Sequence, residues 1–368
     1  MSPSRFERLA ASLRSSDLSA VALNPGPALY HLSGLRFHLM ERPVVLLIPA
    51  HGEPALVLPE FEMPKVDSFP FKVQAFPYGE DPSEWNGAFH RAVGSLGLDG
   101  QRIGVESRQM RLLEFHYVKS GAPQAEFPDA SETLAALRLS KDESEISAMR
   151  RAVRIAEQAL TDTIPSIRIG MTERELASEL SMQLLKNGSE PDLPFAPIVS
   201  AGPNSANPHT SPSERKLQAG DLLVVDWGAT HDGYISDLTR TFAIGNVDEE
   251  CRKIHRIVQE ANAAGCAAAK PGLPAAHVDR AAREGIERSG YGEFFNHRTG
   301  HGIGMEAHEE PYIRGDNPQI LEAGMAFTVE PGIYLPRRNG VRIEDNVVIT
   351  ENGAEILSSM SRELQVIG

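Results

Sequence analysis

The sequence contains very little cysteine. Its two cysteines, Cys251 and Cys266, lie fifteen residues apart in one stretch with a helical pattern. Two thiols are too few for a thiolate metal site, and two residues so placed on one helix do not suit a disulfide. We therefore expect both side chains to lie in the hydrophobic core.

The sequence also lacks a long hydrophobic run and an excess of basic residues. Its longest apolar run, VVLLIPA from Val44, is far too short to span a bilayer, and residues 1–21 contain no apolar core of signal-peptide length. The net charge is −14, and an acidic protein is repelled by a phosphate backbone. We expect a cytoplasmic protein that binds neither membranes nor nucleic acids.

A glycine-rich phosphate-binding loop is absent from the first part of the chain. Apolar segments that resemble strands alternate there with helical patterns, as in a small mixed α/β domain. The helices are expected at 5–14 and 84–96, and the strands at 20–23, 43–49, 54–59 and 102–106. A break is expected at Pro25–Pro27, which reads Pro-Gly-Pro.

The chain length of 368 residues suggests about two domains. The composition changes within 122–146, where proline and acidic residues give way to a helical pattern. Ser140 and Glu143 have the spacing of a capping box, which predicts the start of that helix. We place the domains at 1–132 and 133–368.

The second domain repeats its own sequence pattern. Four residues recur with identical spacing and an offset of 104, and they are Leu217, Gly220, Asp226 and Gly228, matched by Leu321, Gly324, Glu330 and Gly332. Upstream, Gly170 and Gly188 bracket a helical segment, as Gly272 and Gly290 do 102 residues later. This internal duplication predicts two facing halves that bring Asp226 and Glu330 to one pseudo-symmetric centre.

A β-hairpin is expected around residues 220–245, because two strand-forming arms flank turn residues. One arm carries Asp226 and the other carries Asp237. Carboxylates on facing arms could share a cation. Alternatively, Asp226 is an ordinary strand-end residue and Asp237 a solvated one.

Further candidate residues lie in loops and in a last hairpin. Residues 193–212 are rich in proline, asparagine, serine and glycine, so we expect a long loop there, and it carries His209. The segment 296–311 contains three histidines, His297, His301 and His308, among glycines that indicate close backbone approach. Glu344 lies in the hairpin VRIEDNVVIT.

Five residues form a set suited to two divalent ions: Asp226, Asp237, His301, Glu330 and Glu344. The electrostatic repulsion among four ionised carboxylates at one place would be prohibitive without bound cations. Oxygen-rich ligation favours Mn²⁺, while Co²⁺ or Zn²⁺ can occupy the same geometry. Such ions polarise a carbonyl, lower the pKa of a water and neutralise an oxyanion, which is the chemistry of acyl-bond hydrolysis.

The motifs resemble those of the M24 metallopeptidases. The matching segments are PH at 208–209, SDLTRT at 236–241, HRTGHGIG at 297–304, HEEP at 308–311, VEPGIY at 329–334 and VRIED at 341–345. Residues 140–368 are similar to the duplicated pita-bread catalytic domain of this family. The first 130 or so residues resemble the creatinase-like N-terminal domain of prolidases and aminopeptidases P. The expected fold class is α+β, with the pita-bread domain preceded by the smaller mixed α/β domain.

The resemblance implies roles for individual residues. The five candidate ligands would hold a dinuclear metal, and Glu330 would also exchange a proton with the bridging water. His209 and His308 match histidines that hydrogen-bond the substrate and the gem-diolate, and His297 matches a substrate-pocket histidine. Arg342, two residues before Glu344, could orient a carboxylate ligand, meet a substrate charge, or form only a salt bridge at the rim.

The resemblance also implies the substrate, a short proline-containing peptide. A dipeptidase needs a cation for the substrate's free carboxylate, and the candidates are Arg314, Arg337, Arg338 and Arg342. The compact length favours an Xaa-Pro dipeptidase, or prolidase. Aminopeptidase P is the main alternative, and a carboxypeptidase-like mode stays open.

Two further consequences follow from the resemblance. A metal-free pita-bread binding protein or amidinohydrolase would require lost ligands, and all five are present. The family forms homodimers, so we expect a homodimer in which residues near His38 or Trp85 approach the partner's cleft.

Overall fold

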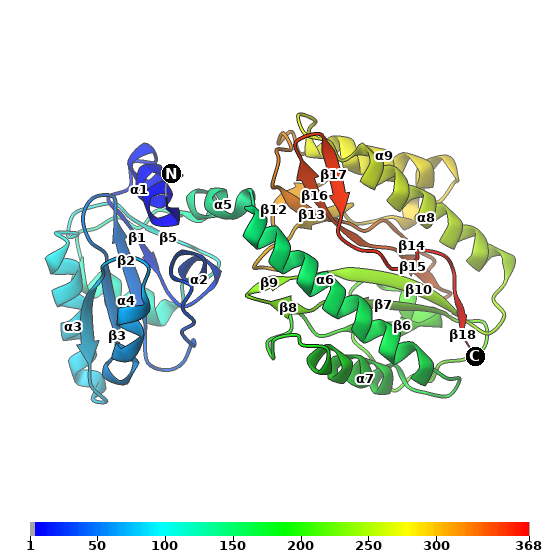
Figure 1. The fold of residues 1–368 in the computed structure, drawn as a ribbon, viewed down its shortest axis with the longest axis horizontal. Coiled ribbons are helices and arrows are strands. Elements are labelled where there is room, and N and C mark those ends of the chain that lie inside the picture. Colours follow the sequence, from blue (N-terminus) through cyan, green and yellow to red (C-terminus); the bar gives the residue numbers. More distant parts are fainter. Residues whose placement is uncertain (1–3, 368) are drawn as a thin grey trace. The chain divides into compact units, whose positions relative to one another are not determined.

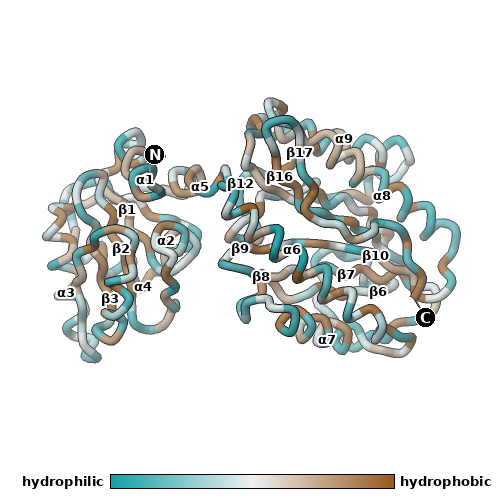
Figure 2. Tube along the Cα trace, in the orientation of Figure 1, coloured by the Kyte–Doolittle hydropathy of each residue, from teal (hydrophilic) through white to brown (hydrophobic). Residues whose placement is uncertain are grey.

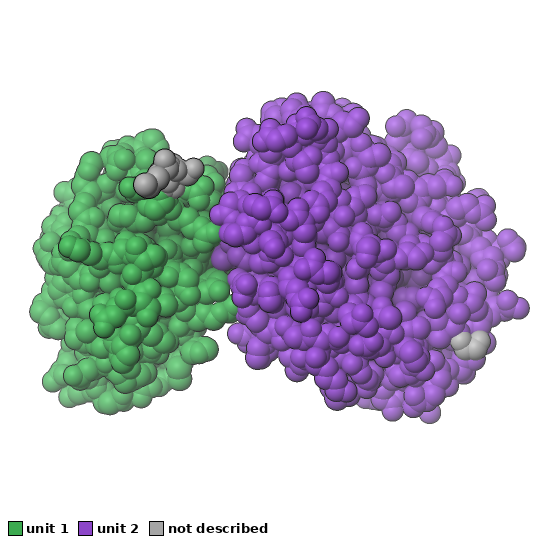
Figure 3. All heavy atoms as spheres, in the orientation of Figure 1, with its two compact units in different colours: residues 1–138 green, residues 139–368 purple. Residues whose placement is uncertain are grey.

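The computed structural model describes residues 4–367 and divides the chain into two compact units, residues 1–138 and 139–368 (Figure 3). Each unit combines helices with a sheet, which confirms the expected fold class (Figure 1). Among residues 4–367, no helix has the length and apolarity that a membrane span requires.

The first unit is built on one five-stranded sheet with the order β4-β3-β2-β1-β5. Its strands are β1 (Ala20–Leu23), β2 (Val45–Pro49), β3 (Ala55–Pro59), β4 (Gln74–Tyr78) and β5 (Ile103–Val105). Its helices are α1 (Arg5–Ser15), α2 (Pro27–Ser33), α3 (Pro82–Ser95), α4 (Leu112–Gly121) and α5 (Ser131–Leu139), with a 3₁₀ segment η1 (Glu60–Ser68).

Both faces of this sheet are buried, as the continuous apolar runs of its central strands require. In β1, Val21 and Leu23 pack into one core with α1, α2 and α5, while Ala20 and Ala22 pack into a second core with α3 and α4. Figure 2 shows the hydrophobic character of these strands. The alternation of side chains along a strand explains why one short segment serves two cores.

The structure adds detail to two expectations for this unit. The break expected at Pro-Gly-Pro separates β1 from α2, and its last residue, Pro27, already belongs to the first helical turn, where its missing N–H is tolerated. Trp85 is only 7% exposed and donates its indole N–H to the Gly79 carbonyl at 2.9 Å. Its side chain is therefore part of this unit's own core, and the approach of residues near His38 or Trp85 to a partner's cleft stays a prediction. His38 is exposed.

The second unit contains two similar halves. The first comprises α6 (Glu143–Thr163), η2 (Ile164–Ser166), α7 (Glu173–Lys186), β6 (Ile198–Ala201), η3 (Gly202–Ala206), β7 (Leu222–Trp227), β8 (Thr230–His231), β9 (Tyr234–Ile235) and β10 (Leu238–Ile244). The second comprises α8 (Glu249–Ala268), α9 (Ala275–Arg288), η4 (Gly292–Phe294), β11 (Gly300–Gly302), β12 (Glu309–Ile313), β13 (Ala326–Val329), β14 (Gly332–Tyr334), β15 (Gly340–Arg342), β16 (Asp345–Thr350), β17 (Gly353–Ile356) and β18 (Val366–Ile367).

The strands form one main sheet in each half. Their orders are β18-β10-β7-β6 and β12-β11-β13-β16-β17, with small two-stranded sheets β14-β15 and β8-β9. Equivalent helices α7 and α9 both have 14 residues. Equivalent glycines Gly220 and Gly324 both adopt left-handed backbone, with φ of 94° and 87°. The duplication predicted from the sequence is therefore present in the fold.

Helix α6 shows how the sequence directs one of these elements. Its buried residues include Ile146, Met149, Val153 and Leu160, at the spacing of one helical face. The expected start at Ser140 is wrong, because the capping box is formed by Asp142 and Glu145. Ser140 instead forms a β-bridge with Met325, which delays the start of the helix by two residues.

Two loops expected from composition also contain ordered strands. The segment 193–212 includes β6, in which Ile198 pairs with Asp226 of β7. In β11, a Cβ on Gly300 would lie 1.8 Å from the Thr328 carbonyl oxygen, and one on Gly302 would lie 2.2 Å from the Glu310 oxygen. The glycines thus allow close backbone approach, as expected, and the neighbour is the protein's own chain.

This close packing gives a first prediction. Gly300→Ala should destabilise the protein by about 1–3 kcal/mol, because the added methyl overlaps fixed backbone. That corresponds to roughly 2–12 °C in Tm. Gly353→Ala is the matched control, since no atom lies within 4 Å of its added Cβ. Equal melting temperatures for the two variants in thermal unfolding would contradict this account.

Candidate functional site

A cavity of about 570 Å³ lies within the second unit. All nine candidate site residues from the sequence line it: His209, Asp226, Asp237, His297, His301, His308, Glu330, Arg342 and Glu344. They come from both halves of the duplication. The structure thus brings together residues that are up to 135 positions apart, from His209 to Glu344.

The carboxylates are delivered by the ends of strands. The expected hairpin is present, with β7 antiparallel to β10, and it places Asp226 near the end of one arm and Asp237 at the start of the other. Glu330 directly follows β13, and Glu344 directly precedes β16. Buried Asn262 of α8 donates from Nδ2 to the carbonyls of Val329 and Ile343, at 2.8 and 3.3 Å, which ties the two glutamate-bearing segments to one helix.

Burial and mutual repulsion make these carboxylates hard to ionise together. Asp226, Asp237 and Glu344 are 8%, 5% and 1% exposed. Burial, followed by the neighbouring carboxylates, raises the pKa of Asp237 and of Glu344 well above their ordinary values. Burial raises the pKa of Glu330 to about 7, with Arg342 opposing the shift and Asp226 adding to it. A nearby cation would relieve this repulsion.

His301 presents a lone pair to the same place. Its Nδ1 lies 3.2 Å from the Gly302 carbonyl oxygen, which can only accept, so Nδ1 carries the proton. Nε2 lies 3.3 Å from Glu330 Oε1 and 3.7 Å from Asp237 Oδ2. Burial, and then His308, holds the pKa of His301 well below its usual range, so the imidazole is neutral. A neutral imidazole fixed through its other nitrogen is a typical arrangement for a metal ligand.

These residues fit a divalent ion. One ligand atom each from Asp237, His301 and Glu344 lies within 4.8 Å of the other two. Asp226 Oδ1 is buried and has no hydrogen-bond partner among residues 4–367. A buried carboxylate oxygen without a donor is expected where a cation binds. The mixture of carboxylate oxygens and imidazole nitrogen suits Mn²⁺, Zn²⁺ or a similar ion.

Arg342 is buried beside Asp226, not Glu344. Its Nη2 donates to Asp226 Oδ2 at 2.6 Å, its Nε to Thr239 Oγ1 at 3.1 Å and its Nη1 to the Tyr334 hydroxyl at 3.0 Å. At 3% exposure it is not a rim salt bridge. The guanidinium therefore fixes one oxygen of Asp226 and leaves the other facing the cavity.

Tyr334 continues this network to His297. His297 Nδ1 donates to the Arg298 carbonyl at 2.7 Å, so Nε2 accepts from the Tyr334 hydroxyl at 2.9 Å. Burial lowers the pKa of His297 to about 4, which keeps the ring neutral. Tyr334 lies in the VEPGIY motif, but its role could not be predicted, because nothing in the local pattern indicates its distant partners.

His209 and His308 occupy other parts of the wall. The ring of His308 lies edge-on to His301, with centroids 4.1 Å apart. His209 is exposed, in a segment whose ends are held by Glu173. Buried Glu173 accepts from the backbone N–H of Ala201 at 2.8 Å and of Ser213 at 3.0 Å.

Arg298 is a cavity residue that the sequence analysis missed. Its guanidinium lies over the Tyr312 ring, 4.5 Å from the centroid. Of the four arginines proposed to hold a substrate carboxylate, only Arg342 lines the cavity. Arg314 is instead paired with Asp316, and Arg338 with Asp248. The position of Arg298 directly after His297 could have indicated its role.

The family models match both units. Residues 147–351 match metallopeptidase family M24, and residues 5–140 match the creatinase/prolidase N-terminal domain. The probable dipeptidase PepE of Mycobacterium tuberculosis is 36% identical over 366 residues, which cover 99% of this chain and 96% of that protein.

Solved structures from other organisms share this fold. A prolidase from Thermococcus sibiricus is 34% identical with a TM-score of 0.93, and the match covers 99% of this chain and 98% of that one. An X-Pro aminopeptidase from Thermotoga maritima is 32% identical with a TM-score of 0.85, over 99% and 100% of the two chains. These matches confirm the resemblance seen in the motifs, and the chain belongs to metallopeptidase family M24, with a creatinase/prolidase N-terminal domain ahead of the catalytic domain.

Proposed function

We propose that this protein is an Xaa-Pro dipeptidase that depends on two divalent metal ions. The observation that carries the proposal is the convergence of four carboxylates, three of them buried, and one neutral imidazole on a cavity that two arginines also line. The similarity to a prolidase and to a probable dipeptidase over nearly the whole chain supports it.

We assign the ions to Asp226, Asp237, His301, Glu330 and Glu344, and Mn²⁺ is the ion that this oxygen-rich set favours, with Co²⁺ or Zn²⁺ as alternatives. When bound, the ions would polarise the scissile carbonyl and lower the pKa of a water molecule to near neutrality. Their positive charge would also permit the neighbouring carboxylates to ionise together.

The remaining steps belong to side chains of this protein. Glu330, with a pKa near 7 before any ion binds, is suited to take a proton from the attacking water and return it to the leaving amine. His308 and His209, on the cavity wall, are placed to donate hydrogen bonds to the developing oxyanion. Arg342 and Tyr334 hold Asp226 and His297 in their orientations.

Substrate selection rests on shape and on one charge. Phe195, Ile198, Pro208 and Ala307 give the cavity an apolar wall, which suits a proline ring that has no N–H to recognise. Arg298 is the arginine of the wall that is not engaged with Asp226. We propose that its guanidinium holds the free carboxylate of a dipeptide.

Aminopeptidase P activity is the second candidate, since the T. maritima X-Pro aminopeptidase matches the full length of the chain. The two activities differ in whether the substrate must end after proline. The homodimer and the cytoplasmic location stay predictions, and sedimentation of the purified protein would test the dimer.

The catalytic assignment predicts that Glu330→Gln lowers kcat for Ala-Pro by about 100-fold to 10,000-fold, because the amide cannot accept the proton. Glu322→Gln, an exposed position in the same repeat, is the matched control and should retain activity. Substantial turnover by a metal-replete Glu330→Gln protein would refute the assignment.

The ligand assignment predicts a pH dependence of stability in the chelated protein. Glu330, Asp237 and Glu344 have raised pKa values in the fold, so above their ordinary pKa the folded state binds more protons than the unfolded state. The buried histidines oppose this only below their ordinary pKa of 6.5, since burial lowers those of His255 and His297 to about 4. Stability should therefore fall as pH rises from 6.5 to about 8.

Differential scanning calorimetry measures this effect as Tm against pH. Saturating Mn²⁺ should remove the fall, because the cation stabilises the ionised carboxylates. A chelated protein whose Tm rises over the same interval would contradict the buried-carboxylate account.

The carboxylate assignment predicts that amidating Ala-Pro lowers kcat/KM by about 10-fold to 100-fold, since a charge-assisted contact contributes about 1.5–3 kcal/mol. Arg298→Gln should lose that discrimination and cleave the free and amidated peptides at similar rates. Arg314→Gln, which alters an exposed arginine outside the cavity lining, should retain it. Cleavage of Ala-Pro-Ala as good as that of Ala-Pro would favour aminopeptidase P instead.

A further inference from the structure

Asn346 is a polar residue that the proposed chemistry does not use. It lies in β16, two positions after Glu344, and its side chain is 0% exposed. A buried amide is unfavourable unless its hydrogen bonds are made. Its partners therefore indicate why an amide occupies this position.

Both hydrogen-bond partners of the Asn346 side chain belong to the backbone of Asp237. The amide Nδ2 donates to the Asp237 carbonyl at 2.6 Å, and Oδ1 accepts from the Asp237 N–H at 3.1 Å. A single side chain thus makes the two contacts that a strand would make to a neighbouring residue. Asp237 belongs to the first half of the duplication and Asn346 to the second, so the amide links the halves.

A second link lies beside it. The Glu344 N–H donates to the Thr239 carbonyl at 3.1 Å, and the Thr239 hydroxyl donates to Glu344 Oε2 at 2.6 Å. Thr239 follows Asp237 by two residues, and Asn346 follows Glu344 by two. The two links together fix both the position and the direction of these segments relative to each other.

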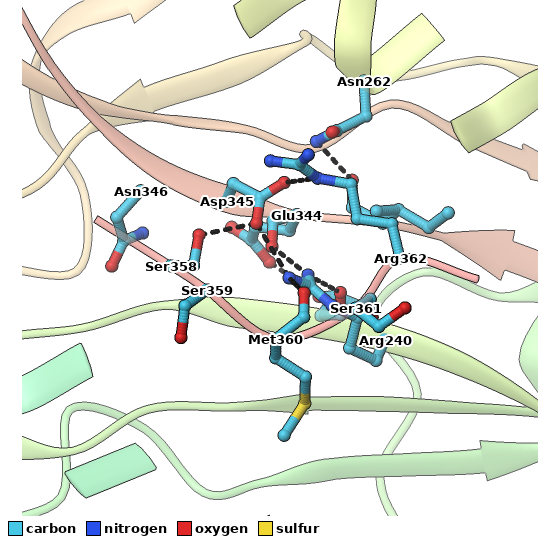
Figure 4. A network of polar contacts seen from close by, with 12 residues as sticks. Arg240, Asn262, Glu344, Asp345, Asn346, Ser358, Ser359, Met360, Ser361 and Arg362 are labelled. Atoms are coloured by element: carbon cyan, nitrogen blue, oxygen red, sulfur yellow. Dashed lines mark hydrogen bonds and ion pairs between the residues drawn. The ribbon is translucent and has the colours of Figure 1, made fainter. Parts of the chain in front are cut away.

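The strand that carries Asn346 is itself held in place. On the opposite side of β16, Asp345 accepts from Arg240 at 2.8 Å, from Arg362 at 2.6 Å and from Ser358 at 2.6 Å. Figure 4 shows this network, with the Asn346 amide turned away from it. Asn346 therefore extends from a fixed support to the backbone of Asp237.

We propose that Asn346 is a positioning residue for metal binding, which sets the backbone of Asp237 so that the carboxylates of Asp237 and Glu344 reach the same ion. The inference rests on the proposed metal site. The ligand atoms of Asp237, His301 and Glu344 already lie within 4.8 Å of one another without an ion. This preorganisation needs a rigid link at Asp237, where the strand β10 only begins.

The test is calorimetric titration of MnCl₂ into the chelated full-length protein. Asn346→Ser shortens the side chain, which then cannot reach the backbone of Asp237. We expect the Mn²⁺ dissociation constant of the site that includes Asp237 to rise about 10-fold to 100-fold. Circular dichroism and Tm of the chelated protein report whether the fold persists. Leu180→Ala, a fully buried position in α7 outside the cavity lining, is the control for lost stability alone and should bind Mn²⁺ as the unchanged protein does.

Asn346→Asp covers the case in which the serine variant does not fold. It keeps the size of the side chain and the acceptor for the Asp237 N–H, and it loses the donor. Its added negative charge would by itself strengthen cation binding. Weaker or unchanged Mn²⁺ binding by this variant therefore supports positioning, and tighter binding overturns it.

The two proposals fail in different ways. If the unchanged protein binds no Mn²⁺ and no other divalent ion, the metal assignment itself is wrong. If it binds the ions and Asn346→Ser binds them equally well, or Asn346→Asp binds them more tightly, only the positioning role is wrong.

Discussion

The structure of the catalytic unit depends on how it accommodates several carboxylates of like charge in one buried space. Two unit charges 4 Å apart interact by about 4 kcal/mol at an effective dielectric of 20, and four carboxylates line this cavity. Two neighbouring residues limit that repulsion. Arg342 neutralises one oxygen of Asp226, and His301 remains neutral with its lone pair turned inward. Burial and this repulsion raise the pKa of Asp237 and Glu344, and these two carboxylates would ionise together only beside a cation.

Glu344, directly before β16, and Asp345, its first residue, show that environment, not residue type, decides the protonation of a buried acid. Burial and the neighbouring carboxylates raise the pKa of Glu344. Burial acts on Asp345 in the same direction, yet Arg240 and Arg362 hold its pKa below the ordinary value. The strand alternation sends one carboxylate to the cavity and the other to a fully paired structural network (Figure 4). Thus one carboxylate faces the proposed metal site, and the next one stabilises the fold.

The sequence was sufficient for features that repeat or alternate locally. The duplication, the Asp226–Asp237 hairpin and the helical face of α6 follow from spacing alone, and the nine candidate site residues were found through the motifs. Features that depend on a distant partner were missed. The sequence pattern predicted Ser140 as a helix N-cap, but Ser140 forms a β-bridge with Met325 instead. The composition around Ile198 predicted a loop, but β7 pairs with this residue. The roles of Tyr334 and Asn346 depend on contacts with residues far away in the sequence, which no local pattern indicates.

Glu173 limits where the segment that carries His209 can lie. Because this buried carboxylate holds both Ala201 and Ser213, it fixes the two ends of a segment of eleven residues. The segment is also held between these ends, since the Gly340 N–H donates to Ser205 Oγ and Arg342 Nη1 donates to the Pro208 carbonyl. The same guanidinium therefore holds the backbone next to His209 and the carboxylate of Asp226, so the histidine of the wall and this acid keep a common reference point.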